Sequence, residues 1–309
     1  MTLTRASHRR HPFLHPFCLL LRIAVGAAAA CARTWYSVRV LNLGGHAELC
    51  RALGDIVISP IDKGFERALP GFPEVHVFGT APSASGGEQL ASGASMSMAA
   101  SVQFSVERWR PLWHTDQSFQ GERKAPALSA LYCESAPETG GDTLFADCAA
   151  AYAALPAADR AALAASRCCH SLSALKARLA AFGGVVLQEG SGKGDAVSAS
   201  SSQPLVRSDG GGRVPALYLN PLASVSVEGP AAGADDAAAA CADRPPPLAL
   251  RLASHATQRR FVHRHRWADG DLVVWDNRCT MHVPTPWAGR RERVVWRLTM
   301  HARRGPSNA

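Results

Sequence analysis

Two side chains that bind metal ions in many proteins, His114 and Asp116, stand two positions apart in the first half of the chain. In an extended strand, residues at positions i and i+2 point to the same face, so the imidazole and the carboxylate would project side by side. Such a pair supplies two ligands of a facial triad for non-haem Fe(II), which needs one more histidine and leaves positions open for other ligands. Alone the pair is a weak signal, because a surface histidine beside a solvated aspartate has the same pattern.

A third candidate ligand and two arginines lie near the C-terminus. His282 follows a predicted strand that ends at Trp275, and Arg293 and Arg297 come after it. On one strand, two residues four positions apart face the same side. A buried arginine is costly unless it meets an anion, and a guanidinium can bind a carboxylate through two parallel hydrogen bonds. We therefore expect one arginine to hold a dicarboxylate cosubstrate; the alternative for Arg297 is pairing with a structural carboxylate such as Asp276.

The composition bounds the class of protein. The chain has 309 residues, of which 47% are hydrophobic and 19% charged, which suits a globular protein with one large domain or two small ones. The net charge is +8, but the first 33 residues carry five arginines and no acidic residue, so the remainder carries only +3 (8 − 5). That charge is too small to predict binding to nucleic acid.

The cysteines are scattered, odd in number and without a Cys-x-x-Cys motif. This pattern argues against a zinc framework or a small disulfide scaffold, and it favours a reduced compartment with free, buried thiols. The nine positions are Cys18, Cys31, Cys50, Cys133, Cys148, Cys168, Cys169, Cys241 and Cys279.

Residues 1–33 differ in composition from the rest of the chain. A basic start leads into an apolar run that ends in small residues, which resembles a targeting segment; a disordered tail is the alternative. His15 and Arg22 interrupt the run, so no stable membrane span is expected. The location would be cytoplasmic, or organellar if the segment is a targeting one. Residues 34–309 are expected to form a single domain with low-complexity loops near 80–100, 187–214 and 228–247, and a homo-oligomer is left open.

Alternating apolar residues predict strands, and apolar residues at helical spacing predict helices. The expected strands are 35–41, 55–58, 73–79, 127–135, 216–220, 261–267, 271–275 and 293–301. The expected helices are 47–53, 148–155, 157–166 and 248–260, with Asp147 as the N-cap of the second. Many short strands with a few inserted helices predict a mainly β protein, a sandwich or jelly roll with helices packed outside.

Four blocks in this order resemble the Fe(II)/2-oxoglutarate-dependent taurine dioxygenase family, which also includes the 2,4-dichlorophenoxyacetate dioxygenases. The blocks are Trp-His-Thr-Asp-Gln-Ser-Phe at 113–119, Gly-Gly-Asp-Thr-Leu-Phe-Ala-Asp at 140–147, the stretch 270–282 with its Trp-Asp-Asn-Arg, and the pair Arg293 and Arg297. The resemblance runs from about residue 34 to the end, but it is loose in the N-terminal strands and between Cys168 and Tyr218.

The resemblance implies a fold, a site and a reaction. The fold is a double-stranded β-helix, the jelly roll of clavaminate synthase-like proteins. The implied iron ligands are His114, Asp116 and His282; the implied contacts to the 2-oxoglutarate carboxylates are Thr143 and Arg293; and Arg297 would hold the acidic group of the substrate. The implied reaction uses Fe(II), 2-oxoglutarate and O2 to hydroxylate a small, anionic organic substrate, and it releases succinate and CO2.

Two other functions fit parts of the pattern. A jelly roll that has lost activity could serve as a binding or scaffold protein, although an intact ligand triplet with both arginines speaks against this. A zinc hydrolase could use the same three ligands. That function would leave Thr143 and Arg293 unexplained.

Overall fold

The protein is represented by a computed structural model, which describes residues 35–39, 43–57, 67–69, 72–79, 112–183, 200–207, 214–238, 244–285, 287–288 and 293–302. The predicted targeting segment at 1–33 and the predicted loop at 80–100 lie outside the described residues. None of the helices in the described part of the chain is long and apolar enough to cross a membrane.

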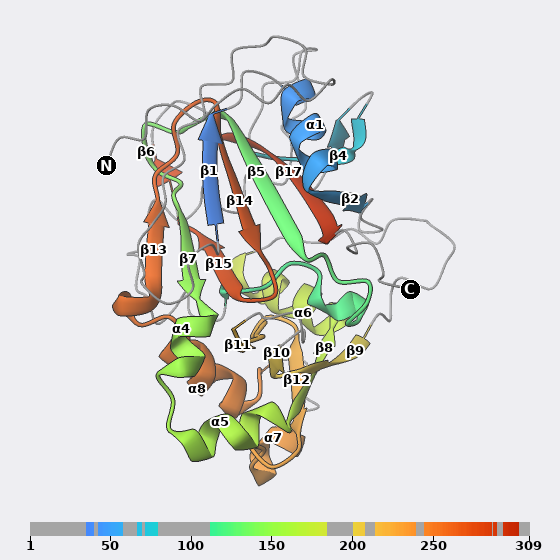
Figure 1. The fold of residues 1–309 in the computed structure, drawn as a ribbon, viewed down its shortest axis with the longest axis vertical. Helices are drawn as coiled ribbons and strands as arrows, with labels where there is room; N and C mark the ends of the chain where they lie inside the picture. The colour runs from blue at the N-terminus through green and yellow to red at the C-terminus, as the bar shows by residue number, and fades with distance from the viewer. Residues whose placement is uncertain are drawn as a thin grey trace, which may run out of the picture.

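An antiparallel sheet of seven strands, counted over the described residues, forms one wall of the molecule (Figure 1). Its order is β1 (Trp35–Arg39), β14 (Asp271–Asp276), β5 (Leu128–Ser135), β17 (Val294–Ala302), β4 (Phe72–Gly79) and β3 (Arg67–Leu69), and β2 (Gly54–Val57) also pairs with β17. The central strands come from distant parts of the sequence, so the sheet brings the C-terminal arginine region beside β5.

A smaller antiparallel sheet faces the large one and completes a jelly roll. It contains β13 (Val262–His265), β7 (Thr143–Asp147) and β15 (Thr280–Pro284), in that order. β16 (Trp287–Ala288) pairs with β6 (Thr139–Gly140) in a short antiparallel ladder. In the sequence, β6 directly precedes β7 and β16 directly follows β15. The expected mainly β jelly roll with helices outside is confirmed.

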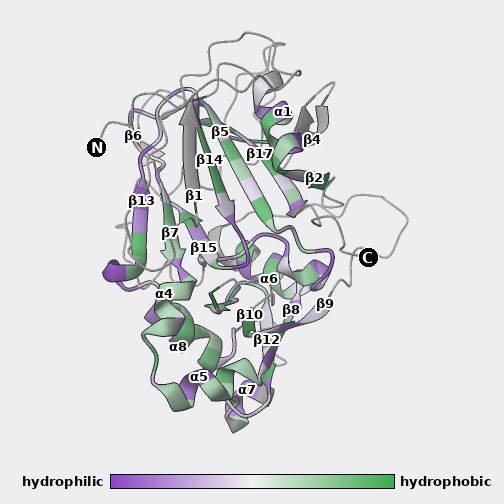
Figure 2. Cartoon of the chain, in the orientation of Figure 1, coloured by the Kyte–Doolittle hydropathy of each residue, from purple (hydrophilic) through white to green (hydrophobic). Residues whose placement is uncertain are grey.

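The two faces of the large sheet bury different sets of side chains because successive residues of a strand point to opposite faces. The inner set lies between the sheets and contains Leu131, Cys133, Phe145, Trp267, Val273, Trp275 and Val295. The outer set packs against Ala47 and Cys50 of α1 (Leu43–Leu53) and contains Ala130, Tyr132, Leu272, Val274, Leu298 and Met300. Figure 2 shows this hydrophobic material in β14, β5 and β17.

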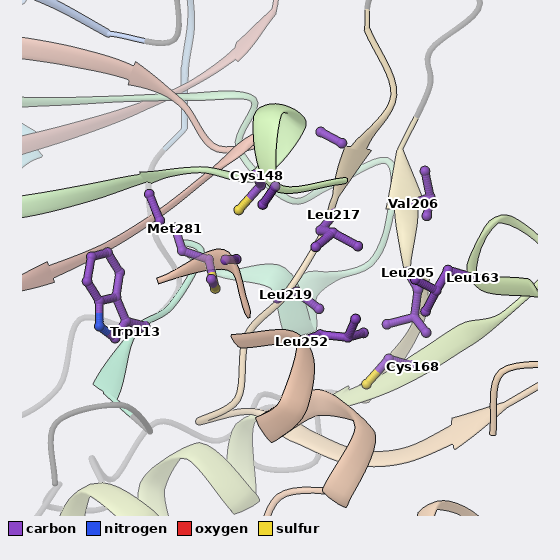
Figure 3. Packing of buried hydrophobic residues seen from close by; sticks show 14 of the residues in the cluster. Trp113, Cys148, Leu163, Cys168, Leu205, Val206, Leu217, Leu219, Leu252 and Met281 are labelled. Atoms are coloured by element: carbon purple, nitrogen blue, oxygen red, sulfur yellow. The ribbon is translucent and has the colours of Figure 1, made fainter. Parts of the chain in front are cut away.

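The remaining helices and a third sheet lie together beyond the end of the jelly roll (Figure 1). The sheet has the order β12 (Ser224–Glu228), β8 (Arg167–Ser171), β9 (Ser200–Pro204), and β10 (Val206–Arg207) pairs with β11 (Ala216–Leu217). The helices are α4 (Cys148–Ala153), α5 (Ala157–Ala164), α6 (Leu172–Gly183), α7 (Ala234–Ala238) and α8 (Pro247–Ala256). A separate hydrophobic cluster fills this region, with Trp113 and Met281 at one end and Leu163 and Cys168 at the other (Figure 3).

Local sequence explains where several of these elements begin. Asp147 caps α4 as predicted, since its carboxylate accepts hydrogen bonds from the backbone N–H groups of Ala149 and Ala150 at 3.0 and 2.9 Å. Pro247 occupies the first turn of α8, where its missing N–H group would have had no helical acceptor.

Most predicted strands and helices are present, with ends shifted by a few residues. The prediction of a loop over 187–214 is wrong for 200–207, which form β9 and β10. The segment 187–214 is rich in glycine and serine, which predicts a loop, but β9 is ordered by its pairing with β8. Similarly, α7 lies within the predicted loop at 228–247. The free cysteines among the described residues form no disulfide, in agreement with the expected free thiols.

Candidate active site

Three candidate metal ligands converge at the end of the jelly roll. One ligand atom each from His114, Asp116 and His282 lies within 4.8 Å of the others. The Oδ1 atom of Asp116 is 3.8 Å from Nε2 of His114 and 3.9 Å from Nε2 of His282. Asp116 and His282 are buried, and His114 is half-buried. Two imidazole nitrogens and one carboxylate oxygen are therefore placed where they could share one metal ion.

The expectation that His114 and Asp116 lie on one regular strand is wrong. His114 instead forms an isolated antiparallel bridge with His282, in which their backbone N–H and C=O groups bond at 3.1 and 2.9 Å. The chain then turns at Asp116, and Gln117 adopts a positive φ of 49° before a short 3-10 helix, η3 (Ser118–Gln120). The bridge sets the two histidines opposite each other, and the turn brings the carboxylate to them.

Gln203 of β9 and the segment that follows β11 hold this turn in place. Thr115 donates its hydroxyl hydrogen to the carbonyl of Leu219 at 2.9 Å. The side-chain amide of Asn220 donates to the Thr115 carbonyl at 2.9 Å and to the Ser118 hydroxyl at 2.8 Å, while Gln203 donates to the Ser118 carbonyl at 2.6 Å. The backbone on both sides of the carboxylate is thus tied to elements more than 80 residues away.

Packing fixes the direction of the two histidines. Trp113 and Met281, each one residue before a histidine, are buried in the hydrophobic cluster beyond the jelly roll (Figure 3). Since neighbouring residues of extended backbone point to opposite sides, the histidines point the other way. The imidazole of His282 lies against Trp275, with ring centroids 4.7 Å apart, and against Phe145 at 6.2 Å.

The charge states of the candidate ligands suit a metal ion. Burial by itself raises the pKa of Asp116, but the positive charge of Arg297, the two histidines and a hydrogen bond from Ser129 together lower it to about 2. Burial, followed by the proximity of His114, lowers the pKa of His282 to about 3, against the opposing effect of Asp116. At neutral pH the carboxylate is therefore ionised and His282 is neutral, as metal ligands must be.

A backbone carbonyl sets the tautomer of His114. Its Nδ1 atom lies 2.9 Å from the carbonyl oxygen of Leu112. A carbonyl can only accept a hydrogen bond, so Nδ1 carries the hydrogen and the lone pair of Nε2 is directed to the site. Metal-binding histidines are commonly oriented in this way. Two neutral imidazoles with one carboxylate are the donor set that non-haem Fe(II) prefers.

The Arg293 side chain is buried beside the Gly140–Gly141 turn. Its Nε donates a hydrogen bond to the carbonyl of Gly141 at 3.1 Å, and its guanidinium lies 5.5 Å from the ring centroid of Trp287. Asp142, which follows Gly141 in the chain, is bonded to Arg264 instead. Burial lowers the pKa of Arg293 to about 10, so the group is still charged at neutral pH. Among the described residues, no side chain accepts a hydrogen bond from its Nη atoms.

Thr143 lies on the same strand face as Phe145 and is buried. The indole N–H of Trp267 donates to its Oγ1 at 3.0 Å. An indole nitrogen can only donate, so the hydroxyl oxygen is the acceptor and the hydroxyl hydrogen is available for another partner. Thr143 therefore offers one hydrogen-bond donor to the space between the sheets.

Arg297 contacts a candidate metal ligand rather than a structural carboxylate. It shares the inner face of β17 with Val295, and its Nη1 donates to Asp116 Oδ1 at 3.2 Å. The alternative partner, Asp276, pairs with Arg278 at 2.6 Å. The structure thus brings all the sequence-predicted site residues to the inner side of the jelly roll, with Arg297 closest to the ligand triplet.

Several residues that build the site were not predicted from the sequence. Ser129 and Asn277 form a hydrogen-bond chain to Asp116, and Asn220 and Gln203 hold its turn. Asn277 belongs to the Trp-Asp-Asn-Arg block, so the sequence contained a signal for it. The other three are ordinary polar residues in strands or turns, and only their neighbours in space show what they do.

A sequence comparison places this geometry in a family. The model of the family described as "Taurine catabolism dioxygenase TauD, TfdA family" matches residues 38–299. The chain belongs to the TauD/TfdA family. This finding confirms the resemblance on which the site residues were predicted, and the match includes the candidate ligands and both arginines.

Curated relatives in the TauD/TfdA family carry the names of dioxygenases. The α-ketoglutarate-dependent 2,4-dichlorophenoxyacetate dioxygenase of Cupriavidus pinatubonensis is 39% identical over 172 residues, which are 55% of this chain and 53% of that protein. The (S)-phenoxypropionate/α-ketoglutarate-dioxygenase of Delftia acidovorans is 34% identical over 194 residues, 62% of this chain and 61% of that protein. The chain thus matches between about half and three fifths of the length of these relatives.

A solved structure shares the fold. A taurine dioxygenase from Burkholderia xenovorans superimposes with a TM-score of 0.59 and 22% sequence identity, and the match covers 89% of this chain and 80% of the other. At this level of identity the likeness shows the common jelly roll of the TauD/TfdA family and nothing about the substrate.

Proposed function

We propose that this protein is an Fe(II)- and 2-oxoglutarate-dependent dioxygenase that hydroxylates a small, anionic organic compound and releases succinate and CO2. The observation that carries the proposal is the convergence of His114, Asp116 and His282 on one point between buried walls. The names of the relatives in the TauD/TfdA family support the reaction type and the cosubstrate, α-ketoglutarate, which is another name for 2-oxoglutarate.

The three converging side chains would hold the iron. When bound there, Fe(II) would supply the activation of O2 that couples the decarboxylation of 2-oxoglutarate to the oxidation of a C–H bond. The protein's own contribution would be to keep His282 neutral, to keep Asp116 ionised, and to exclude bulk water through the aromatic rings of Phe145 and Trp275. Only three ligand atoms come from the chain, which leaves positions for the cosubstrate and O2.

Arg293 and Thr143 would bind the carboxylate of 2-oxoglutarate that lies away from the iron. The guanidinium of Arg293 is charged, buried and hydrogen-bonded only through Nε within the described residues, so its Nη atoms can form a charge-assisted pair with a carboxylate. The free hydroxyl hydrogen of Thr143 supplies a second donor. A dianionic cosubstrate would thus accept hydrogen bonds from donors for which the described residues provide no acceptor.

Arg297 would attract the acidic group of the prime substrate. In the structure it donates to Oδ1, the oxygen of Asp116 that faces the histidines. A metal ion bound to that oxygen would weaken its hold on the arginine, because the oxygen's negative charge would be shared with the cation. The guanidinium would then be available for an organic anion. The relatives named for a phenoxyacetate and a phenoxypropionate support an organic acid as the substrate class.

The two other functions make different predictions. An inactive jelly roll would neither bind Fe(II) tightly nor consume 2-oxoglutarate. A zinc hydrolase would bind Zn(II) through the same three ligands and act without O2 or 2-oxoglutarate. The buried charge of Arg293, with no acidic partner among the described residues, has no role in either of them.

Anaerobic titration with Fe(II) and 2-oxoglutarate tests the proposal directly. The expected result is a visible metal-to-ligand charge-transfer absorption band that requires both components, followed on exposure to O2 by formation of succinate. A screen of aryloxy acids, sulfonates and sulfate esters, with succinate as the readout, would then identify the substrate class by the compound that accelerates turnover most.

Two controls make the test specific. His282→Ala should give no absorption band, and Zn(II) in place of Fe(II) should give neither the band nor succinate. An Fe(II)-loaded protein that shows no band with 2-oxoglutarate would contradict the proposed cosubstrate. Turnover of an ester or amide with Zn(II), in the absence of 2-oxoglutarate, would favour the hydrolase.

A further inference from the structure

A chain of buried hydrogen bonds ends on the carboxylate of Asp116. Ser129 Oγ lies 2.6 Å from Asp116 Oδ2, Asn277 Nδ2 lies 2.7 Å from Ser129 Oγ, and Trp275 Nε1 lies 3.0 Å from Asn277 Oδ1. None of these side chains is more than 3% exposed. Ser129 and Trp275 face each other across β5 and β14, so the chain is built into the centre of the large sheet.

The groups at the two ends fix the direction of the bonds in this chain. Trp275 Nε1 can only donate, so it must meet the oxygen of the Asn277 amide rather than its nitrogen. The Asn277 nitrogen then faces Ser129 and donates to its oxygen. At the other end the ionised carboxylate of Asp116 can only accept, so the Ser129 hydroxyl donates its hydrogen to Oδ2. Ser129 thus accepts a hydrogen bond from Asn277 and donates one to Asp116.

The two oxygens of Asp116 are consequently unequal. Oδ2 is occupied by a short hydrogen bond from Ser129. Oδ1 lies 3.8 and 3.9 Å from the histidine Nε2 atoms, and it accepts a longer hydrogen bond, of 3.2 Å, from Arg297. A carboxylate held in this way offers one oxygen to a metal ion, whereas a free carboxylate can offer both.

We propose that Ser129, oriented by Asn277 and Trp275, is a positioning residue that makes Asp116 a one-oxygen metal ligand. This inference rests on the proposed function. An octahedral ion that binds two histidines, one carboxylate oxygen and a chelating keto acid has one position left for O2. A second oxygen from Asp116 would take that position or displace part of the keto acid. Ser129 therefore keeps a coordination position open without touching the metal.

A purely structural role for Ser129 is the alternative. In that case its hydroxyl would only satisfy a buried carboxylate, and removing it would lower the stability of the fold without changing how the metal is held. Ser166 provides a matched control. It is equally buried, and its hydroxyl donates to the carbonyl of Ala162 at 2.8 Å, far from the ligand triplet.

The test compares Ser129→Ala, Ser129→Thr and Ser166→Ala by titration of the metal-free protein with Co(II) alone. The readouts are the dissociation constant, the visible absorption spectrum of the bound Co(II), which responds to the number and arrangement of its ligands, and the melting temperature without metal. We expect Ser129→Ala to change the dissociation constant about tenfold and to alter the spectrum. Ser129→Thr, which keeps the hydroxyl, should restore both, and Ser166→Ala should lower only the melting temperature.

Asn277→Asp provides a second test that hardly changes the side chain's shape. An aspartate at this position accepts hydrogen bonds from both neighbours, so it draws the Ser129 hydrogen away from Asp116. The Co(II) spectrum of this variant should therefore shift in the same direction as that of Ser129→Ala.

Two outcomes would overturn the inference in distinguishable ways. If Ser129→Ala and Ser166→Ala bind Co(II) with the same affinity and spectrum as the unaltered protein, Ser129 is structural and the proposed function is untouched. If the unaltered protein itself binds no Co(II), and gives no absorption band with Fe(II) and 2-oxoglutarate, the proposed function fails and the inference fails with it.

Discussion

Two arginines are almost equally buried in this protein, and their surroundings differ. Arg178 on α6 is 4% exposed, and its guanidinium donates to the backbone carbonyls of Pro221, Leu222, Ser224 and Arg244 at 2.7 to 3.0 Å. Arg293 is 6% exposed, and its Nε donates to one carbonyl, that of Gly141, at 3.1 Å. Arg178 is thus surrounded by acceptors that the fold provides, while Arg293 carries donors for which the described residues provide none.

The difference supports our proposal that Arg178 is a structural cation and Arg293 a ligand-binding one. A buried charged group without acceptors costs free energy, so a fold keeps such a group only where another requirement demands it. Arg178 ties α6 to the 221–224 turn and to the chain before α8, and it needs no ligand. Arg293 donates only to the Gly141 carbonyl among the described residues, and a bound dicarboxylate would complete its hydrogen bonds. Burial alone does not reveal function, but the balance of donors and acceptors does.

The largest expected effect comes from removing one of the three candidate metal ligands, because the metal would bind the other end of the 2-oxoglutarate that Arg293 would hold. His114→Ala, Asp116→Ala and His282→Ala should each lower turnover by at least about a thousandfold, because the loss of one of three ligands releases the metal. Far-UV circular dichroism should stay that of the folded protein. Succinate formation measures the loss, and a variant that keeps near-normal 2-oxoglutarate consumption would remove that residue from the ligand set.

Arg178→Met should destabilise the fold and leave the ligand site unaffected. It leaves several buried carbonyls without a donor, and we expect a loss of about 3–5 kcal/mol in the free energy of unfolding. Urea denaturation measures the loss, and calorimetric titration of the iron-loaded protein with 2-oxoglutarate under argon should give an unchanged affinity. A variant as stable as the unaltered protein would show that Arg178 is not a structural clamp.

Replacing Arg293 by methionine should affect ligand binding and should not destabilise the fold. Arg293→Met should weaken 2-oxoglutarate binding by about 2–3 kcal/mol, which is roughly the loss of a charge-assisted bidentate contact. Its free energy of unfolding should be unchanged or higher, because an unsatisfied buried charge is gone. The same calorimetric titration decides the matter, and an unchanged cosubstrate affinity would remove the assignment of Arg293 as the anchor.

Gly141→Ala should affect Arg293 indirectly. Gly141 has a φ of +67°, and an added Cβ would lie 2.6 Å from Pro137 Cγ and 3.1 Å from Arg293 Cδ. The turn must therefore shift, at a cost of about 1–2 kcal/mol, and it carries the carbonyl that holds the guanidinium. We expect 2-oxoglutarate affinity to fall several-fold. Gly121→Ala, also at positive φ but with no contact shorter than 3.3 Å, is the control, and equal affinities in the two variants would argue against the positioning of Arg293 by this turn.

The smallest effect concerns a third buried basic group. His170 is fully buried, and burial, followed by the charge of Arg207, lowers its pKa to about 3. Since the unfolded chain takes up the proton near pH 6.5 and the folded chain does not, the stability is present above that pH and is lost as the pH falls below it. Lowering the pH to 5.5 should cost about 1 kcal/mol from this residue. The pH profile of His170→Phe should be flatter by that amount, and a parallel profile would show that His170 is not the cause.

The outcome for single residues shows how far the sequence could lead. The blocks around His114, Thr143 and His282 predicted the fold class and the candidate site, because their order and spacing resemble those of the family to which the chain belongs. The regular strand expected for His114 and Asp116 was wrong, since the turn at Gln117 depends on bonds from Asn220 and Gln203. Periodicity within a few residues contains no information about such distant partners.

What the sequence by itself determined is the inventory of the candidate site: three candidate metal ligands, two arginines and a threonine, placed on a chain whose alternating apolar residues predict packed sheets. Only the tertiary structure decided which groups these side chains meet. It pairs Arg297 with Asp116 and not with Asp276, it surrounds Arg178 with carbonyls, and it leaves the Nη atoms of Arg293 without an acceptor from the described residues. The reason is that hydrogen bonds act over about 3 Å in space, whereas the residues they join here lie as much as 181 positions apart in the chain.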